Sequence, residues 1–299
     1  MPGAFRAPQY RIMEHSPPAH TVIRPPASPS RHQRVDGHAR VAFGADGIRD
    51  LYQRSPCRLL FPDTEPGDLR QAVSITTSGG LTGGDRVRLE IAVDAHARGA
   101  VTTQAAEKLY RVLPDDPDIR IETRIEIGEA GVCEWLAQEA ILFDRSRVRR
   151  SLQVDLGPAA RMLAVESLVF GRSAMGETFA TGLIHDAWRI RRGGRLVWAD
   201  ALHVDGDFAA TADRPFGFGG ARAIATIVYA GADAADHLDL GRALAGAPSG
   251  GATAMDELLI LRLIDADARA LRDRVMRAAS ALRAAALALP ARLPAVWYC

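Results

Sequence analysis

Strand-like segments follow one another from Arg40 to about Ala230 without a helix of normal length between them. The stretches "RVRLEIAV" and "IRIETRIEI" alternate apolar and polar residues with a period of two, as half-buried strands do. "AWRIRRGGRLVWADAL" predicts a hairpin, because Gly193 and Gly194 supply the positive φ angles of a tight turn. A doubly wound α/β sheet needs helices between its strands. The sequence therefore predicts a mainly β protein.

A weak internal repeat favours stacked coils of sheet within this region. Three segments align on their last aromatic residue, and each follows a turn-like stretch: "AVTTQAAEKLY" (100–110), "CEWLAQEAILF" (133–143) and "ARMLAVESLVF" (160–170). In this alignment Glu139 and Glu166 occupy the same column. Repeats of this length that consist of strands indicate a β-helix-like, stacked-sheet domain. A β-sandwich is the alternative.

The two ends of the chain differ from this β region. Residues 1–34 are rich in Pro, His and Arg and lack hydrophobic periodicity, so we expect a disordered extension. Residues 35–299 are expected to form a single β domain with two helices in its last quarter. The first helix is expected within 236–246, and the second begins after a capping Asp265. An apolar stripe on the second helix is expected to pack on the sheet: Leu271, Val275, Ala279, Leu282 and Ala286.

Composition and charge exclude several classes of partner. The formal net charge of the 299 residues is +1, and no basic stripe indicates nucleic-acid binding. No apolar run reaches the roughly 18 residues of a membrane span. Cys57, Cys133 and Cys299 are too far apart for a CxxC zinc site or a disulfide framework, so a reducing cytoplasmic setting is expected. Lys108 is the only lysine among 37 basic residues, so arginine clusters reflect a compositional bias.

The stretch "SITTSGGLTGGDRVRLEIAV" (74–93) is rich in glycine, as phosphate-binding loops are. A Walker loop requires a lysine and leads into a helix, whereas this stretch contains no lysine and leads through Asp85 into a strand. Four histidines in or beside the N-terminal extension allow a loosely metal-binding tail, although their spacing is irregular: His15, His20, His32 and His38. We interpret the glycine stretch as a bend between strands, where absent side chains let backbones pack closely.

Acidic residues within otherwise apolar strands are the remaining chemical signal. An ionised carboxylate in such a setting costs several kcal/mol unless it is paired or hydrated. The acids concerned are Glu134, Glu139, Asp144, Glu166 and Glu177. Three interpretations stay open. The acids pair with Arg145, Arg172 and Arg189, or they line an internal water-filled channel, or two of them form a glycosidase pair.

Four segments taken in order resemble one protein family. They are "TSGGLTGGDRVRLEI", "TTQAAEKLYR", "EWLAQEAILFDRSRVRRSLQVDL" and "VESLVFGRSAMGE", and together they are similar to the UreD (UreH) urease accessory proteins. The resemblance covers about residues 35 to 297 and includes the terminal "LPAVWYC". The N-terminal extension departs from the family pattern. So do Ala137, where a proline is expected, and Glu107, where a threonine is usual.

The resemblance implies a function in urease maturation that is not enzymatic. UreD-like proteins assist nickel insertion into urease, bind urease subunits, and bind UreF, which recruits the GTPase UreG. The resemblance also implies a β-helix-like fold with two helices and an internal tunnel for nickel. It implies Ni(II) as transient cargo with no tightly bound cofactor, and it allows a dimer within the accessory complex.

Candidate residues for this function fall into two sets. Scattered carboxylates in a wet channel would bind Ni(II) weakly enough to release it, so a tight metal site is not expected. The candidate channel residues are Glu139, Asp144, Glu166, Glu177, Asp85 and Glu134. The residues of the family motif, to which we assign a structural role, are Ser78, Gly79, Gly80, Gly83, Gly84, Gln104, Tyr110 and Arg111. A β-solenoid that acts on or binds a polysaccharide is the alternative function.

Overall fold

The computed structural model describes residues 34–172, 175–214 and 217–299. The expected disordered extension, apart from Arg34, therefore lies outside the described residues, as do His15, His20 and His32. None of the helices in the described ranges is long and apolar enough to cross a membrane.

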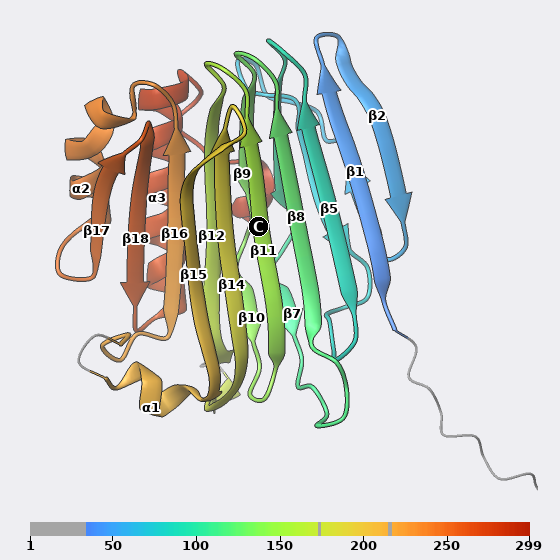
Figure 1. The fold of residues 1–299 in the computed structure, drawn as a ribbon, viewed down its shortest axis with the longest axis vertical. Helices are drawn as coiled ribbons and strands as arrows, with labels where there is room; N and C mark the ends of the chain where they lie inside the picture. Colours follow the sequence, from blue (N-terminus) through green and yellow to red (C-terminus); the bar gives the residue numbers. More distant parts are fainter. Residues whose placement is uncertain (1–33, 173–174, 215–216) are drawn as a thin grey trace, which may run out of the picture. The chain divides into compact units, whose positions relative to one another are not determined.

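Two large β-sheets dominate the described part of the chain (Figure 1). Sheet A has seven strands, in the spatial order β15 (Arg195–Asp207), β14 (Thr181–Arg192), β11 (Arg147–Leu156), β8 (Ile119–Ile127), β5 (Arg86–Val93), β1 (Asp36–Gly44) and β2 (Gly47–Arg54). The main path of sheet B runs β17 (Gly250–Met255), β18 (Leu258–Asp265), β16 (Ala223–Ala230), β12 (Arg161–Arg172), β9 (Val132–Leu136), β6 (Arg98–Thr103), β4 (Gln71–Thr76) and β3 (Cys57–Leu60). Three short strands complete it, namely β7 (Glu107–Leu109), β10 (Ala140–Leu142) and β13 (Glu177–Thr178).

The chain passes back and forth between the two sheets in stacked coils. Strands β5, β8, β11 and β14 pair in parallel in sheet A, and β4, β6, β9 and β12 pair in parallel in sheet B. The turns that precede the three repeat segments contain His96, Ala130 and Ala159, each with a positive φ angle. These turns also stack, because the N–H of His96 donates to the carbonyl of Glu129 at 2.8 Å. The predicted mainly β, β-helix-like fold is confirmed.

Antiparallel strands close both ends of the stack. Strand β2 pairs with β1 at one end, and β15, β16, β18 and β17 follow at the other. The hairpin between β14 and β15 turns at Gly193 (φ 54°) and Gly194 (φ 79°), as the sequence predicts. Trp188 and Trp198 pack edge to face across this hairpin, with ring centroids 5.7 Å apart.

Alternating side chains explain why the sheets face each other. In β11, Val148, Leu152, Val154 and Leu156 are buried, while the residues between them, apart from Arg150, are at least partly exposed. The buried side chains join clusters that include strands of both sheets. Burial of apolar area at about 25 cal/mol per Å² is the main stabilising term for such a core.

Helices cover the other face of sheet B (Figure 1). These are α2 (Leu238–Ala245), which ends at Gly246 with φ 64°, and α3 (Ala268–Leu287). The predicted apolar stripe of α3 is buried against sheet B and α2, so its packing role is confirmed. Short helical turns lie at η2 (Ala234–His237) and at η3 (Ala295–Trp297).

One local prediction about helices is wrong, and one short helix was not predicted. Asp267, and not Asp265, caps α3, since its carboxylate accepts the N–H groups of Arg269 and Ala270 at 2.7 and 3.1 Å. Asp265 ends β18, and its carboxylate accepts the N–H of Asp267. The sequence also gave no sign of α1 (Phe208–Ala212), a five-residue helix at the end of β15.

The repeat alignment is wrong by one residue in its third copy. Strand β10 pairs with β12 so that Ala140 lies beside Leu168, which places Glu139 next to Ser167. Glu139 and Glu166 therefore do not share a column. Because successive side chains of a strand point to opposite faces, this single step puts the two carboxylates on opposite sides of sheet B.

Candidate functional site

Successive bulges interrupt sheet B near its middle. The register pairs Thr102 with Leu136 and then Glu107 with Ala140, so residues 103–106 lie opposite the shorter segment 137–139. Segment 137–139 is itself one residue longer than the part of β12 that it faces. Leu136 pairs with Val165 and Ala140 pairs with Leu168, so three residues lie opposite the two residues 166–167. Bulges of this kind re-aim side chains and are common beside functional sites.

A cavity of about 270 Å³ lies against these bulges, between the two sheets. Its walls come from β4, β5, β8, β9, β11 and β12, together with the bulge segments and the 79–80 loop. The polar side chains among its lining residues are Ser74, Thr76, Thr103, Gln104, Glu107, Lys108, Glu122, Thr123, Gln138, Arg150 and Glu166. Ala105 and Lys108 are exposed, so the cavity reaches the surface beside the 104–108 segment.

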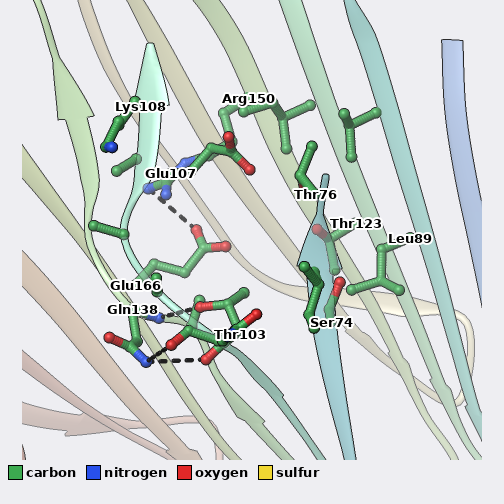
Figure 2. A pocket seen from close by; sticks show the side chains of 18 of the residues that line it. Ser74, Thr76, Leu89, Thr103, Glu107, Lys108, Thr123, Gln138, Arg150 and Glu166 are labelled. Carbon is green, nitrogen blue, oxygen red and sulfur yellow. Dashed lines mark hydrogen bonds and ion pairs between the residues drawn. The ribbon is translucent and has the colours of Figure 1, made fainter. Parts of the chain in front are cut away.

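Glu166 is the buried carboxylate of this cavity (Figure 2). It is 4% exposed, and its Oε1 accepts the indole N–H of Trp135 at 3.1 Å. Its Oε2 lies 3.3 Å from Nη2 of Arg150 but accepts no hydrogen bond from the protein. Arg150 instead directs two hydrogen bonds of 2.8 Å at Asp186. One carboxylate oxygen of Glu166 is thus left with an ion contact alone.

The electrostatic setting keeps Glu166 close to its titration point. Burial raises the pKa of Glu166 to about 7, and the negative charge of Asp186 adds to this shift. Arg150 and the hydrogen bond from Trp135 act in the opposite direction. The Glu166 carboxyl therefore titrates near neutral pH.

Glu107 is a second carboxylate in the cavity wall, and it is not one of the channel residues predicted from the sequence. Burial raises the pKa of Glu107, against hydrogen bonds from the Thr76 side chain and the Lys108 backbone. Its one signal in the sequence was that it replaces the threonine expected from the family resemblance. Lys108 is exposed next to it, at the surface end of the cavity.

Comparison with known proteins shows to which family this chain belongs. The model of the UreD urease accessory protein family matches residues 35–298. The chain belongs to the UreD family. A UreD of Rhizobium leguminosarum bv. trifolii is 43% identical over 275 residues, which cover 91% of this chain and 98% of that protein. UreD of Magnetococcus marinus is 41% identical, with 89% and 94% covered, and UreD of Granulibacter bethesdensis is 41% identical, with 80% and 99% covered.

The glycine motif that marks this UreD chain shapes the wall of the cavity. Gly80 has φ 143°, and a Cβ atom at this position would lie 2.9 Å from the carbonyl oxygen of Lys108 and 2.5 Å from the ring of Tyr110. The Tyr110 hydroxyl donates to the carbonyl of Gly79 at 2.9 Å, and the Ser78 hydroxyl donates to the carbonyl of Gly80 at 3.0 Å. The glycine therefore permits a close approach between the 77–84 loop and β7.

Asp85, at the end of the glycine motif, caps the turn. It is 2% exposed, and its two carboxylate oxygens accept the N–H groups of Val35 at 2.7 Å and Thr82 at 2.8 Å. The carboxylate is thus occupied by backbone donors on both sides. Two other motif residues, Gln104 and Arg111, are exposed, and Gln104 also lines the cavity.

Glu134 lies in a buried ion-pair cluster on the helix side of sheet B. It is fully buried and accepts hydrogen bonds from Nε and Nη2 of Arg283 at 2.7 and 3.0 Å. Arg283 also contacts Asp68 and donates to the carbonyls of Pro290 and Arg292. This geometry links α3, the C-terminal segment and sheet B.

The other predicted acids also have defined partners away from the cavity. Glu139 pairs with Arg272 of α3 at 2.7 Å. Asp144 accepts the N–H groups of Ala180 and Thr181, at the start of β14. Glu177 accepts the N–H of Asp144 at 3.2 Å and pairs with Arg172. Among the described residues, Glu166 is thus the one member of the predicted channel set that lines the cavity.

Proposed function

We propose that this chain is a non-enzymatic maturation factor for urease that passes Ni(II) towards the urease active site in the cytoplasm. In this role it binds urease subunits and UreF, and through UreF it is linked to UreG. Membership of the UreD family supports the connection to urease, since the matched relatives carry the name urease accessory protein UreD.

The observation that carries the nickel part of the proposal is the buried, incompletely paired carboxylate of Glu166. Oxygen donors suit a divalent cation that must be bound and then released. The free Oε2 of Glu166, the carboxylate of Glu107 and nearby threonine hydroxyls supply such donors within one cavity. No group of three or more His, Cys, Asp or Glu side chains within the described ranges is placed to hold a metal ion. We propose weak and transient binding, in which the Arg150 guanidinium, 3.3 Å from Glu166, competes with the cation.

Arg150 contributes the release step of this proposal. Two hydrogen bonds to Asp186 hold its guanidinium 3.3 Å from the Glu166 carboxylate. A cation at Glu166 must compete with this fixed positive charge, which lowers its affinity. When the cation leaves, the positive charge of Arg150 again balances the negative charge of the Glu166 carboxylate.

The pair of acids that the repeat suggested does not have the geometry of a glycosidase pair. Such an enzyme needs two carboxyl groups on either side of one glycosidic bond, about 5 to 10 Å apart and facing the same space. Glu139 and Glu166 lie on opposite faces of sheet B, so they cannot act together on one bond.

Complementation of urease activation tests the proposed function. The full chain is expressed with matched urease subunits, UreF and UreG in a host that lacks its own UreD. We expect it to restore urease activity and the nickel content of the purified urease. Glu166→Gln should reduce nickel content while the variant still copurifies with its partners. Glu126→Gln, an exposed acid of β8, serves as the matched control and should retain full loading. Failure of the unmodified chain to restore activity would refute the proposal.

A further inference from the structure

The outer face of sheet A, which is turned to the viewer in Figure 1, is lined mostly by charged side chains. Helices α2 and α3 pack on sheet B, and the alternation along the strands of sheet A points their apolar side chains into the core between the sheets. The register then arranges the outward side chains of sheet A in rows that cross the strands. Neighbouring strands are about 4.8 Å apart, so side chains next to each other in one row interact.

One of these rows carries basic side chains on five neighbouring strands. His203 of β15 pairs with His185 of β14, and His185 pairs with Arg149 of β11. Arg149 also pairs with Arg120 of β8, and Arg120 pairs with Arg86 of β5. We call these five residues the basic row. It presents only basic groups from β15 to β5.

The rows further along the same strands alternate in sign instead. Arg124 of β8 pairs with Glu90 of β5, and Glu90 pairs with Arg40 of β1. Between that row and the basic row, Glu122 pairs with Arg88. The chain contains 37 lysines and arginines and 36 acidic residues, so composition does not account for a row of one sign. Like charges in opposed positions destabilise a sheet, and such a row is therefore expected where a partner supplies the opposite charge.

The arginines of the basic row are largely left without acidic partners. Arg149 donates to Asp118 at 2.8 Å. Arg86 and Arg120 are exposed, and neither forms an ion pair with any residue in the described ranges. Burial, His203 and Arg149 together lower the pKa of His185, as expected beside uncompensated positive charge. Two guanidinium groups are thus available to carboxylates of another molecule.

The spacing of the basic row favours an α-helix as the element that covers it. Five strands that are ~4.8 Å apart make a row about 19 Å long. A helix laid across the strands advances about 5.4 Å per turn, so one carboxylate per turn departs from the row by only about 2 Å over its length. Side chains on one face of an extended strand repeat every ~6.7 Å and would depart from it by about 8 Å. Flexible arginine side chains accommodate the smaller difference.

The surroundings of the basic row favour a protein over a nucleic acid. Single-stranded nucleic acids bind where positive charge is combined with aromatic rings on which bases stack. The basic row contains no tryptophan, tyrosine or phenylalanine. Glu122 and Glu90 in the rows beside it would repel phosphates. A helix with carboxylates on one face places its charge along the row and avoids these acids.

We propose that the outer face of sheet A docks an acidic α-helix of a protein partner. The helix lies across the strands from β15 to β5 and places one carboxylate per turn on the basic row. Arg86 and Arg120 make the main contacts, because they have no acidic partner within the described part of the chain. This inference goes beyond the proposed function. It involves neither the cavity nor nickel, so the two are tested separately.

Synthetic peptides test the docking geometry. The probe is a fluorescein-labelled, alanine-rich peptide of about 20 residues, long enough to form a helix alone, with glutamates at i, i+4, i+7 and i+11 on one face. A second peptide of the same composition distributes its glutamates around the helix, and a third alternates glutamate and threonine to favour an extended chain. Fluorescence anisotropy with the full chain is measured at about 0.15 M salt. The one-face peptide should bind about tenfold more tightly than either of the others, because it alone aligns all its carboxylates with the row.

Variants show whether the peptide binds to the basic row. Arg120→Glu should weaken binding of the one-face peptide about fivefold, and the double variant Arg86→Glu/Arg120→Glu about 25-fold. Arg277→Glu makes the same change of charge at an exposed position of α3 and should alter the affinity less than about twofold. Arg120→Gln should raise the melting temperature at low salt, because it removes a like charge from between two others. The melting temperatures of the other variants verify that they are folded.

Four outcomes would overturn the inference. Equal binding of the three peptides would indicate diffuse attraction, and tighter binding of the extended peptide would indicate a strand as the occupant. A labelled oligothymidylate of about 15 nucleotides that binds more tightly than the one-face peptide would make the row a nucleic-acid site. An affinity that Arg120→Glu leaves unchanged would place the peptide elsewhere on the molecule. A melting temperature that falls in Arg120→Gln would show that the row is already compensated within the protein.

Discussion

Replacing Glu166 with glutamine tests the electrostatic description of the cavity most directly. The substitution keeps the shape of the side chain and removes its titration. Burial shifts the pKa of this carboxyl from 4.5 to about 7, which corresponds to about 3 kcal/mol at ~1.4 kcal/mol per pKa unit. The folded protein holds this proton more tightly than the unfolded chain. The wild type therefore loses up to that much stability as the pH rises from about 4.5 to about 7, and no more above it.

Urea unfolding at a series of pH values measures this effect. The free energy of unfolding of Glu166→Gln minus that of the wild type should increase with pH, by about 2 to 3 kcal/mol between pH 5 and pH 8, and level off above about pH 7. Glu126→Gln should show a difference that hardly changes over this range, because its carboxylate is exposed. A difference that is flat or falls with pH for Glu166→Gln would refute the reasoning. It would mean that Arg150 keeps the carboxylate ionised throughout.

Three further predictions concern the groups that build the site and its support. Arg283→Met should lower the free energy of unfolding by about 3 to 5 kcal/mol, measured by urea denaturation, because it leaves two buried carboxylates without their partner. Addition of Glu134→Gln should recover part of that loss, and no recovery would contradict the ion-pair role. Gly80→Ala should cost about 1 to 3 kcal/mol in the same assay, since its Cβ atom would press on Tyr110; an unchanged midpoint would show that the loop moves aside. Asp267→Ala should cost about 1 kcal/mol through loss of the α3 cap, whereas a cost below a few tenths would indicate that solvent replaces it.

Local patterns were sufficient to predict most of the fold. The alternation in segments such as "RVRLEIAV" identified strands because one face of each sheet packs on the core. The stripe that includes Leu271 and Val275 identified the face of α3 that packs on sheet B, and Gly246 marked the end of α2. Each of these patterns depends only on residues that are close together in the sequence. Asp265 failed as a cap because two aspartates stand close together, and only backbone geometry decides which one the helix uses.

The cavity could not be predicted in the same way, because it results from differences of one residue in length between successive coils of the chain. Its outline depends on segment 103–106 being one residue longer than the segment that it faces in the next coil. Several alignments of the repeat segments are possible, and a single sequence does not show which of them puts the extra residue at the correct position. Glu107 was missed for this reason, since nothing in "AAEKLY" shows that its carboxylate lies in the cavity wall beside Thr76. Glu134 was equally ambiguous, because its partner Arg283 is far away in the sequence.

The register of sheet B separates Glu139 and Glu166, which the repeat had placed in one column. If Glu139 and Glu166 shared a column, they would form a stacked pair of like charges on one face, and such neighbours repel. With the observed register each lies on its own face and has its own arginine, at 2.7 Å for Glu139 and 3.3 Å for Glu166. The sheet therefore keeps a single cation from contacting both carboxylates at once. The bulge at 137–139 produces this separation, because it adds one residue opposite 166–167 and so moves Glu139 out of the column of Glu166. The bulge is held in place by Gln138, whose amide lies within hydrogen-bond distance of the carbonyls of Gln104 and Val296.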